Sequence, residues 1–147
     1  MLLDTLTNDL NTALKSGDKL RTQTLRFLIA AVKKYDIDTY LPGSSDKLSE
    51  ADVTKIINNQ VKTHKESVTA FTKGRRQDLV DKETAELDIL KKYLPPELSD
   101  GEIKNIAASV MSQGLTNFGP VMGAVMKEVD GRASGDRVQK IVKQLLN

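Results

Sequence analysis

The sequence predicts an all-α protein, with a four-helix N-terminal part that contains a long antiparallel helical hairpin and a small three-helix C-terminal part. Apolar residues recur at intervals of three and four along almost the whole chain, as they do on one face of a helix. No segment has the pattern of a strand, and no fixed-period repeat is found. Pro95-Pro96 cannot continue a helix, so the predicted domains are residues 1–95 and 96–147.

The first two helices are separated by Ser16-Gly17-Asp18, which is expected to end one helix and cap the next. The second is expected to run to about Tyr35, and its wide apolar arc predicts burial against several neighbours. That arc comprises Leu20, Leu25, Phe27, Leu28, Ala31 and Val32. Residues 36–48 follow as the only long irregular segment.

Ser49 opens the third and longest helix, with Asp52 placed to favour its N-terminus. Its expected apolar face comprises Val53, Ile56, Ile57, Val61, Val68 and Phe71. Gly74 and its neighbours then turn the chain back into a fourth helix that ends at Tyr93-Leu94. The two helices should form an antiparallel hairpin.

The C-terminal part contains three shorter predicted helices. Ser99 and Glu102 form a capping box for the fifth, which Gly114 closes. Asn117 and Pro120 start the sixth, whose Met122 and Met126 are interpreted as core residues. The seventh is expected to start at Asp136, in the cap position.

Glu83 falls in the middle of the apolar arc of the fourth helix, where an unpartnered carboxylate would cost several kcal/mol. His64 lies on the apolar face of the third helix, about as far before the turn as Glu83 lies after it. We therefore expect a buried His64–Glu83 pair, or else Arg76 takes the carboxylate. The pair is interpreted as structural, since no nucleophile accompanies it for acid–base catalysis.

Composition limits the possible functions. The chain has no Cys and a single His, so disulfides, thiolate sites and zinc are not expected, and no metal or cofactor is predicted. Phosphate-binding loops, dinucleotide fingerprints and catalytic triads are absent, which argues against a self-sufficient enzyme. The longest apolar run is too short for a bilayer. We expect a cytoplasmic protein without a membrane partner.

The net charge of +2 is too small to indicate nucleic acid, but its distribution is uneven. Residues 55–76 hold six basic residues against the single acid Glu66, whereas residues 78–88 hold five acids against Lys82. Lys62 projects from the solvated face of the third helix, with Lys65 at its edge. This face is either a phosphate track or an ordinary solvated surface. No aromatic residue is interleaved there for base stacking.

A second basic group surrounds the loop before the last helix. Arg132 lies in the loop Gly131-Arg132-Ala133-Ser134-Gly135, and Arg137 and Lys140 lie beyond it, away from the apolar stripe. The loop is either a plain helix connection or an anion or RNA site at a helix N-terminus. An aspartate at the cap would repel a phosphate.

Several short motifs in order resemble the YqeY family. They are Leu25-Arg26, Arg76-Gln77-Asp78-Leu79, Lys82-Glu83, Glu86-Leu87, Tyr93-Leu94-Pro95, Gly123-Ala124-Val125-Met126 and Gly131-Arg132-Ala133. Members of that family are small helical proteins similar to the tail domain of one subunit of the glutamyl/aspartyl-tRNA amidotransferase. The resemblance implies the four-plus-three helix division and a link to tRNA-dependent amidation. Free-standing members often carry a carbon-nitrogen ligase label, but no catalytic residue transfers to this chain.

The chain departs from the family pattern at Gly74-Arg75, at Ser134 and at His64, which affects particular RNA contacts rather than the fold. The leading hypothesis is a non-catalytic tRNA-binding accessory. Its candidate RNA contacts are Lys62, Lys65, Arg75, Arg76, Arg132, Arg137 and Lys140. The alternative is a protein-protein adaptor that docks on an amidotransferase or another tRNA-modifying enzyme.

Overall fold

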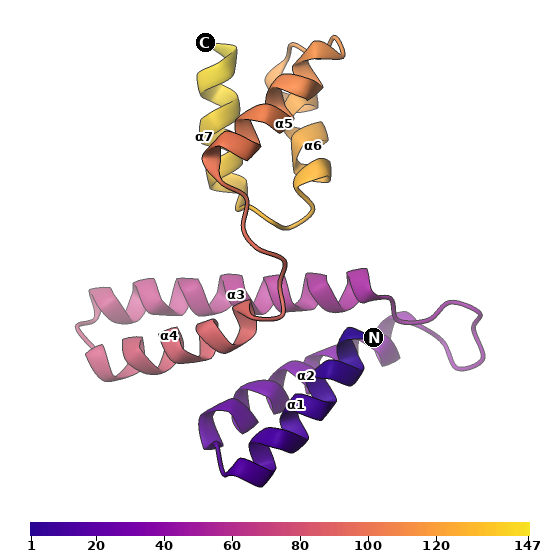
Figure 1. Ribbon diagram of the computed structural model, residues 1–147, viewed down its shortest axis with the longest axis vertical. Helices are drawn as coiled ribbons and strands as arrows, with labels where there is room; N and C mark the ends of the chain where they lie inside the picture. The colour runs from indigo at the N-terminus through magenta and orange to yellow at the C-terminus, as the bar shows by residue number, and fades with distance from the viewer. The chain divides into compact units, whose positions relative to one another are not determined.

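The computed structural model describes residues 1–147 as seven α-helices without strands, which confirms the all-α prediction (Figure 1). The helices are α1 (Leu2–Ser16), α2 (Lys19–Thr39), α3 (Glu50–Lys73), α4 (Gln77–Lys91), α5 (Asp100–Ser112), α6 (Phe118–Val129) and α7 (Gly135–Leu146). The chain divides into two compact units, Met1–Leu94 and Pro95–Asn147. No helix has the length and apolar character needed to cross a membrane.

The N-terminal unit consists of two helical hairpins that pack on each other. Gly17 ends α1 in the left-handed conformation at φ 73°, and the side chain of Asp18 then accepts the backbone N–H of Arg21 to cap α2. The long helix α3 lies antiparallel beside α4 (Figure 1). All four helices contribute to one apolar core, which comprises Leu6, Leu25, Leu28, Ile29, Val32, Val53, Ile56, Ile57, Val61, Leu87 and Leu90.

The reversal between α3 and α4 occurs at the predicted place. Gly74 caps the end of α3, and Arg75 follows in the left-handed region at φ 56°. The backbone N–H of Arg76 then donates to the carbonyl of Phe71 at 3.0 Å. This bond satisfies one of the last carbonyls of α3, and the turn directs the chain back along the helix.

The C-terminal unit is a three-helix cluster with its own core. Ser99 and Glu102 form the predicted capping box at the start of α5. The backbone N–H of Leu98 donates to the carbonyl of Arg132 at 2.8 Å, which fixes the segment before α5 to the loop before α7. The core comprises Leu98, Ile103, Ala107, Val110, Val121, Val125, Val129, Ala133, Val138, Ile141 and Val142, with Met122 and Met126 partly buried against it.

Two expectations for α2 were wrong. The helix continues to Thr39 rather than ending near Tyr35, so the irregular segment covers residues 40–49. No helix breaker precedes Pro42, and Lys34 forms an ion pair with Asp38 one turn further on, which supports the extra turn. Phe27 was placed in the apolar arc but is 78% exposed, because the core meets a narrower arc centred on Leu25 and Leu28.

Two helix boundaries also differ from the expectations. Helix α4 ends at Lys91, and Tyr93 and Leu94 form the turn that precedes Pro95, since a residue before proline is disfavoured in a helix. Helix α7 begins at Gly135, and its cap is Ser134, whose side chain accepts the backbone N–H of Arg137 at 3.4 Å. Asp136 is therefore inside the first turn, where its charge still favours the helix N-terminus.

Candidate functional site

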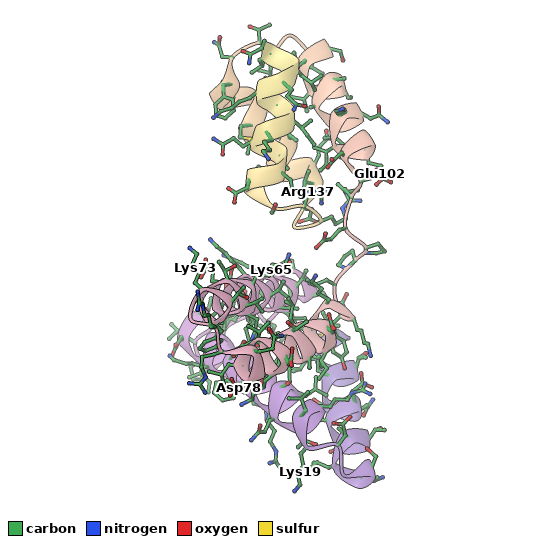
Figure 2. The ribbon with its side chains drawn as sticks, turned by 90° about the vertical axis from the view of Figure 1, so that its left-hand side faces the viewer. Lys19, Lys65, Lys73, Asp78, Glu102 and Arg137 are labelled. Atoms are coloured by element: carbon green, nitrogen blue, oxygen red, sulfur yellow. The ribbon has the colours of Figure 1, made fainter.

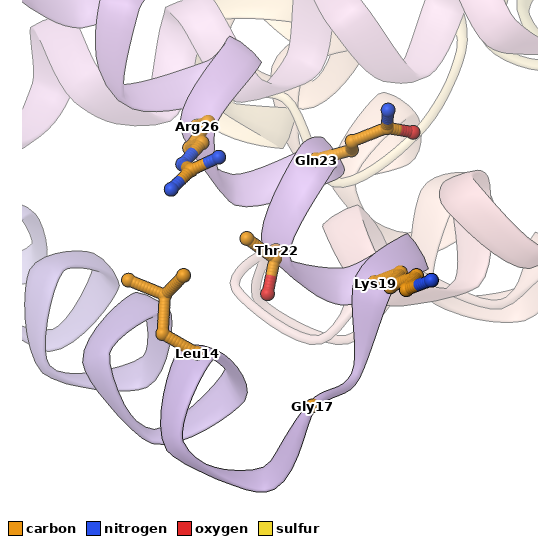
Figure 3. Close-up of a pocket in the computed structure, with 6 residues that line it drawn as sticks. All are labelled: Leu14, Gly17, Lys19, Thr22, Gln23 and Arg26. Atoms are coloured by element: carbon orange, nitrogen blue, oxygen red, sulfur yellow. The ribbon is translucent and has the colours of Figure 1, made fainter.

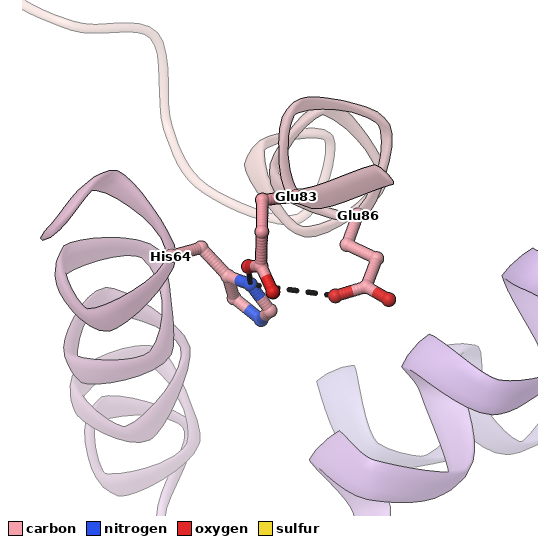
Figure 4. Close-up of side chains that lie close together, drawn as sticks. All are labelled: His64, Glu83 and Glu86. Carbon is pink, nitrogen blue, oxygen red and sulfur yellow. Dashed lines mark hydrogen bonds and ion pairs between the residues drawn. The ribbon is translucent and has the colours of Figure 1, made fainter. Parts of the chain in front are cut away.

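The facing sides of α3 and α4 hold a cluster of three ionisable side chains. His64 projects from α3 toward Glu83 and Glu86 of α4, as Figure 4 shows. The imidazole Nδ1 shares a hydrogen bond with Oε2 of Glu83 and lies 3.5 Å from Oε2 of Glu86. The exposed fractions of the three side chains are 21%, 19% and 14%, so the cluster is half-buried rather than sealed in the core.

The structure brings His64 and Glu83 together, and the alternative partner for Glu83 was wrong. The guanidinium of Arg76 pairs instead with Asp78, through Nε at 3.2 Å and a second nitrogen at 3.0 Å. This two-bond contact raises the pKa of Arg76 and lowers the pKa of Asp78. Arg76 therefore stays at the start of α4. A contact with Asp78, two residues away, costs less conformational entropy than a contact with Glu83, two turns away.

Sequence reasoning missed Glu86 as a member of the cluster. It lies three residues after Glu83, and residues at that spacing share a helix face. The signal was therefore present in the sequence. Lys82 also approaches Glu86, with its ammonium 4.0 Å from Oε1.

The outward side of α3 presents the basic residues predicted for a phosphate track. Lys62, Lys65 and Lys73 are exposed, and Figure 2 shows Lys65 and Lys73 on the same side of the helix. Arg75 is exposed at the turn that follows. These exposed cations run from the middle of α3 to the turn before α4, with the exposed acid Glu66 among them.

The basic residues of the C-terminal unit are arranged differently. Arg132 donates to the carbonyls of Val129 and Glu128 at 3.0 and 2.9 Å, which caps the end of α6. Arg137 donates to the carbonyl of Leu98 and to Asp100, both at 2.8 Å. The guanidinium of Arg132 therefore holds its loop to the end of α6, and that of Arg137 joins the start of α7 to the segment before α5. Lys140 is exposed on α7.

A further exposed surface on α2 was not predicted. Phe27 lies on the solvent side of α2 next to Arg26, and Ile37 is 76% exposed further along the same helix. Near the α1–α2 turn, Lys19, Gln23 and Arg26 line an open hollow of about 470 Å³ (Figure 3). An exposed aromatic ring is therefore present on α2, a helix that also carries exposed cations.

These features define a class of small all-helical proteins that have two separate apolar cores and charged side chains on the exposed faces of their helices. Within that class, the chain belongs to the Yqey-like protein family, whose family model matches residues 3–146. The resemblance inferred from the short motifs is thereby confirmed.

Several relatives share the name altered inheritance of mitochondria protein 41, mitochondrial. The protein from Pyrenophora tritici-repentis is 30% identical over 99% of this chain and 81% of its own length. The protein from Lachancea thermotolerans is 30% identical over 90% and 72%, and that from Clavispora lusitaniae is 27% identical over 99% and 85%.

The names of these relatives contradict the expectation of a cytoplasmic protein, because all three are called mitochondrial. The expectation rested on the lack of cysteine and of long apolar runs. Neither property distinguishes one reducing aqueous compartment from another, so neither was a reason to expect the cytoplasm in particular.

Proposed function

We propose that this protein is a non-catalytic accessory that binds tRNA through its shape and phosphates, in connection with tRNA-dependent amidation. The observation that supports this most directly is the exposed basic surface of α3, on which Lys62 and Lys65 face solvent and Arg75 extends the surface at the turn. Lysine and arginine side chains neutralise the phosphates of a nucleic-acid backbone without reading its sequence.

The contacts on the C-terminal unit are weighted differently in this proposal. Arg132 and Arg137 hold loops through internal hydrogen bonds, so a phosphate would compete with carbonyl or carboxylate partners. Lys140 is exposed and can contribute to the electrostatic attraction. We therefore treat Arg132 and Arg137 as secondary and assign most of the binding to the α3 surface, where Lys62 and Arg75 are exposed.

A titration of tRNA against the protein at a series of salt concentrations tests the proposal. Replacement of Lys62, Lys65 and Arg75 together by alanine should reduce the slope of log affinity against log salt by about 2 to 3, because each phosphate contact contributes about 0.7–0.9. The control variant replaces Lys15, Lys47 and Lys91, which are exposed cations of the same unit outside this surface.

The control should leave most of the salt dependence in place, although both variants lose the same net charge. Equal losses in the two variants would show that only the overall charge matters. Binding by the unchanged protein no stronger than that of a neutral helical bundle at low salt would reject the tRNA proposal.

The apolar surface of α2 favours a second candidate function, a protein-protein adaptor. Phe27 and Ile37 are 78% and 76% exposed, and large exposed apolar side chains are typical of interface anchors. The partner would be an amidotransferase or another tRNA-modifying enzyme. If Phe27→Ser with Ile37→Ser abolishes capture of one defined enzyme of that class and leaves tRNA binding unchanged, the adaptor function is favoured.

A further inference from the structure

The cluster between α3 and α4 holds two carboxylates and one imidazole, and Lys82 is the cation that pairs with it from the solvent side. Glu83 and Glu86 share one imidazole, and even a protonated His64 would leave one negative charge. Lys82 reaches only Oε1 of Glu86, at 4.0 Å, and its side chain is 54% exposed. Arg76, which the sequence offered as an alternative partner for Glu83, is held by Asp78.

The geometry of the cluster suits a metal ion. One ligand atom from each of His64, Glu83 and Glu86 lies within 4.8 Å of the other two. The three side chains come from two helices and converge on one point between them (Figure 4). They are between 14% and 21% exposed, so water can reach the remaining coordination positions while the helices shield the ligands.

We propose that His64, Glu83 and Glu86 bind a divalent transition-metal ion of the Zn²⁺ or Co²⁺ type. An imidazole nitrogen with two carboxylate oxygens is a ligand set that such ions accept, with water in the remaining position or positions. Magnesium and calcium prefer oxygen ligands only, and the imidazole selects against them. The metal takes the place between Nδ1 and the carboxylates that the hydrogen bond now occupies.

Metal–ligand bonds of about 2.0–2.2 Å require ligand atoms roughly 3–3.5 Å apart. The spacing of His64 Nδ1 and Glu86 Oε2 already falls in that range, at 3.5 Å. Glu83 must withdraw from its hydrogen bond by a change of side-chain rotamer, which its partial exposure permits.

Because the ligands belong to both helices, the bound metal would hold α3 and α4 together. An ion that binds the folded protein and not the unfolded chain stabilises the fold in proportion to its concentration. The proposed site is independent of the tRNA surface, since His64 lies on the side of α3 that faces α4, while Lys62 and Lys65 are exposed.

Direct titration of tag-free, EDTA-dialysed protein tests the site. We expect one equivalent of Co²⁺ to bind and give a visible ligand-field absorption, Zn²⁺ to displace it, and Zn²⁺ to raise the melting temperature. Mg²⁺ at the same concentration should do neither. Glu86→Gln should lower Co²⁺ affinity at least about tenfold, and His64→Gln should do the same.

If His64→Gln fails to fold, Glu86→Gln still tests the metal site, because the Glu86 variant leaves the His64–Glu83 hydrogen bond in place. Asp88→Asn is the matched control, since it removes an exposed carboxylate from the same helix outside the cluster and should bind Co²⁺ as the unchanged protein does. The proposal is overturned if the unchanged protein binds no Co²⁺, if Mg²⁺ competes equally, or if all three variants bind alike.

Discussion

The hydrogen bond between His64 and Glu83 joins the two halves of the hairpin with about a fifth of each side chain exposed. At this burial each group has lost much of its hydration, and a partner across the interface replaces it. Such a pair does not need to add much net stability to matter, because the loss of one partner leaves the other without compensation. The pair therefore selects the register in which α3 and α4 face each other.

Glu83→Gln should lower the free energy of unfolding by about 1–2 kcal/mol, because a neutral amide replaces a charge-assisted hydrogen bond in a half-buried place. Urea unfolding in the presence of EDTA measures this without contributions from bound metal. Glu66→Gln serves as the control, since Glu66 is exposed on α3. If the two variants unfold at the same urea concentration, the pair does not stabilise the hairpin.

Tyr40 provides a pH test at the residue scale. Its hydroxyl donates to Oδ2 of Asp52 at 2.9 Å, and this hydrogen bond to a carboxylate raises the pKa of Tyr40 to about 12. The unfolded chain releases the proton near pH 10, the ordinary value. The folded state thus holds the proton more tightly, so the associated stability is complete below pH 10 and is lost as pH rises toward 12.

Tyr40→Phe should therefore flatten the decline of the unfolding free energy between pH 10 and 12, measured by urea titration at several pH values. Lysines ionise in the same range but do so in both proteins, so the difference between the two curves isolates Tyr40. Asp52→Asn should flatten the curve in the same way. Parallel curves for Tyr40→Phe and the unchanged protein would contradict the assignment.

At the scale of the element, caps fix where helices begin. The side chain of Ser99 accepts the N–H of Glu102 at 3.2 Å, and the carboxylate of Glu102 accepts the N–H of Ser99 at 2.7 Å. The second bond is the largest cause that lowers the pKa of Glu102. The reciprocal pair satisfies two backbone donors that the first turn of α5 would otherwise leave to water.

Ser99→Ala should destabilise the C-terminal unit by about 1 kcal/mol, because one of these donors loses its partner. Thermal unfolding followed by circular dichroism measures the change. Ser109→Ala on the exposed side of α5 is the matched control and should change stability by less than about 0.5 kcal/mol. A loss in the control as large as in Ser99→Ala would mean that the cap contributes nothing particular.

The pattern of apolar residues in α2 does not predict how wide a sector of the helix is buried. Its arc of apolar residues is wide enough to suggest burial on several sides, yet Phe27 and Ile37 lie in solvent. Periodicity identifies a helix and its hydrophobic direction, but it does not say how wide a sector the neighbours cover. That width depends on where α1, α3 and α4 pack, which the sequence of α2 does not contain.

At the scale of the molecule, the two units keep separate apolar cores. Every buried residue of the first core precedes Pro95, and every buried residue of the second follows Pro96. Basic residues outnumber acidic ones along α3 and its turn, where residues 55–76 hold six basic residues and one acid. A protein of nearly neutral total charge can therefore attract polyanions locally, since screening in salt confines attraction to within about 10 Å.

Local spacing and backbone chemistry were enough to predict seven helices, the turn at Gly74 and the capping box at Ser99, although the ends of α2 and α4 and the start of α7 differed. The sequence also brought His64 opposite Glu83, since an antiparallel turn places residues at equal distances from it. The spacing of Glu86 from Glu83 places both on one face of α4, but the contact of Glu86 with His64 and the exposure of Phe27 came from the packing of the helices. Those outcomes depend on which surfaces other helices cover and which donors lie nearest, and these are properties of packing rather than of any one segment.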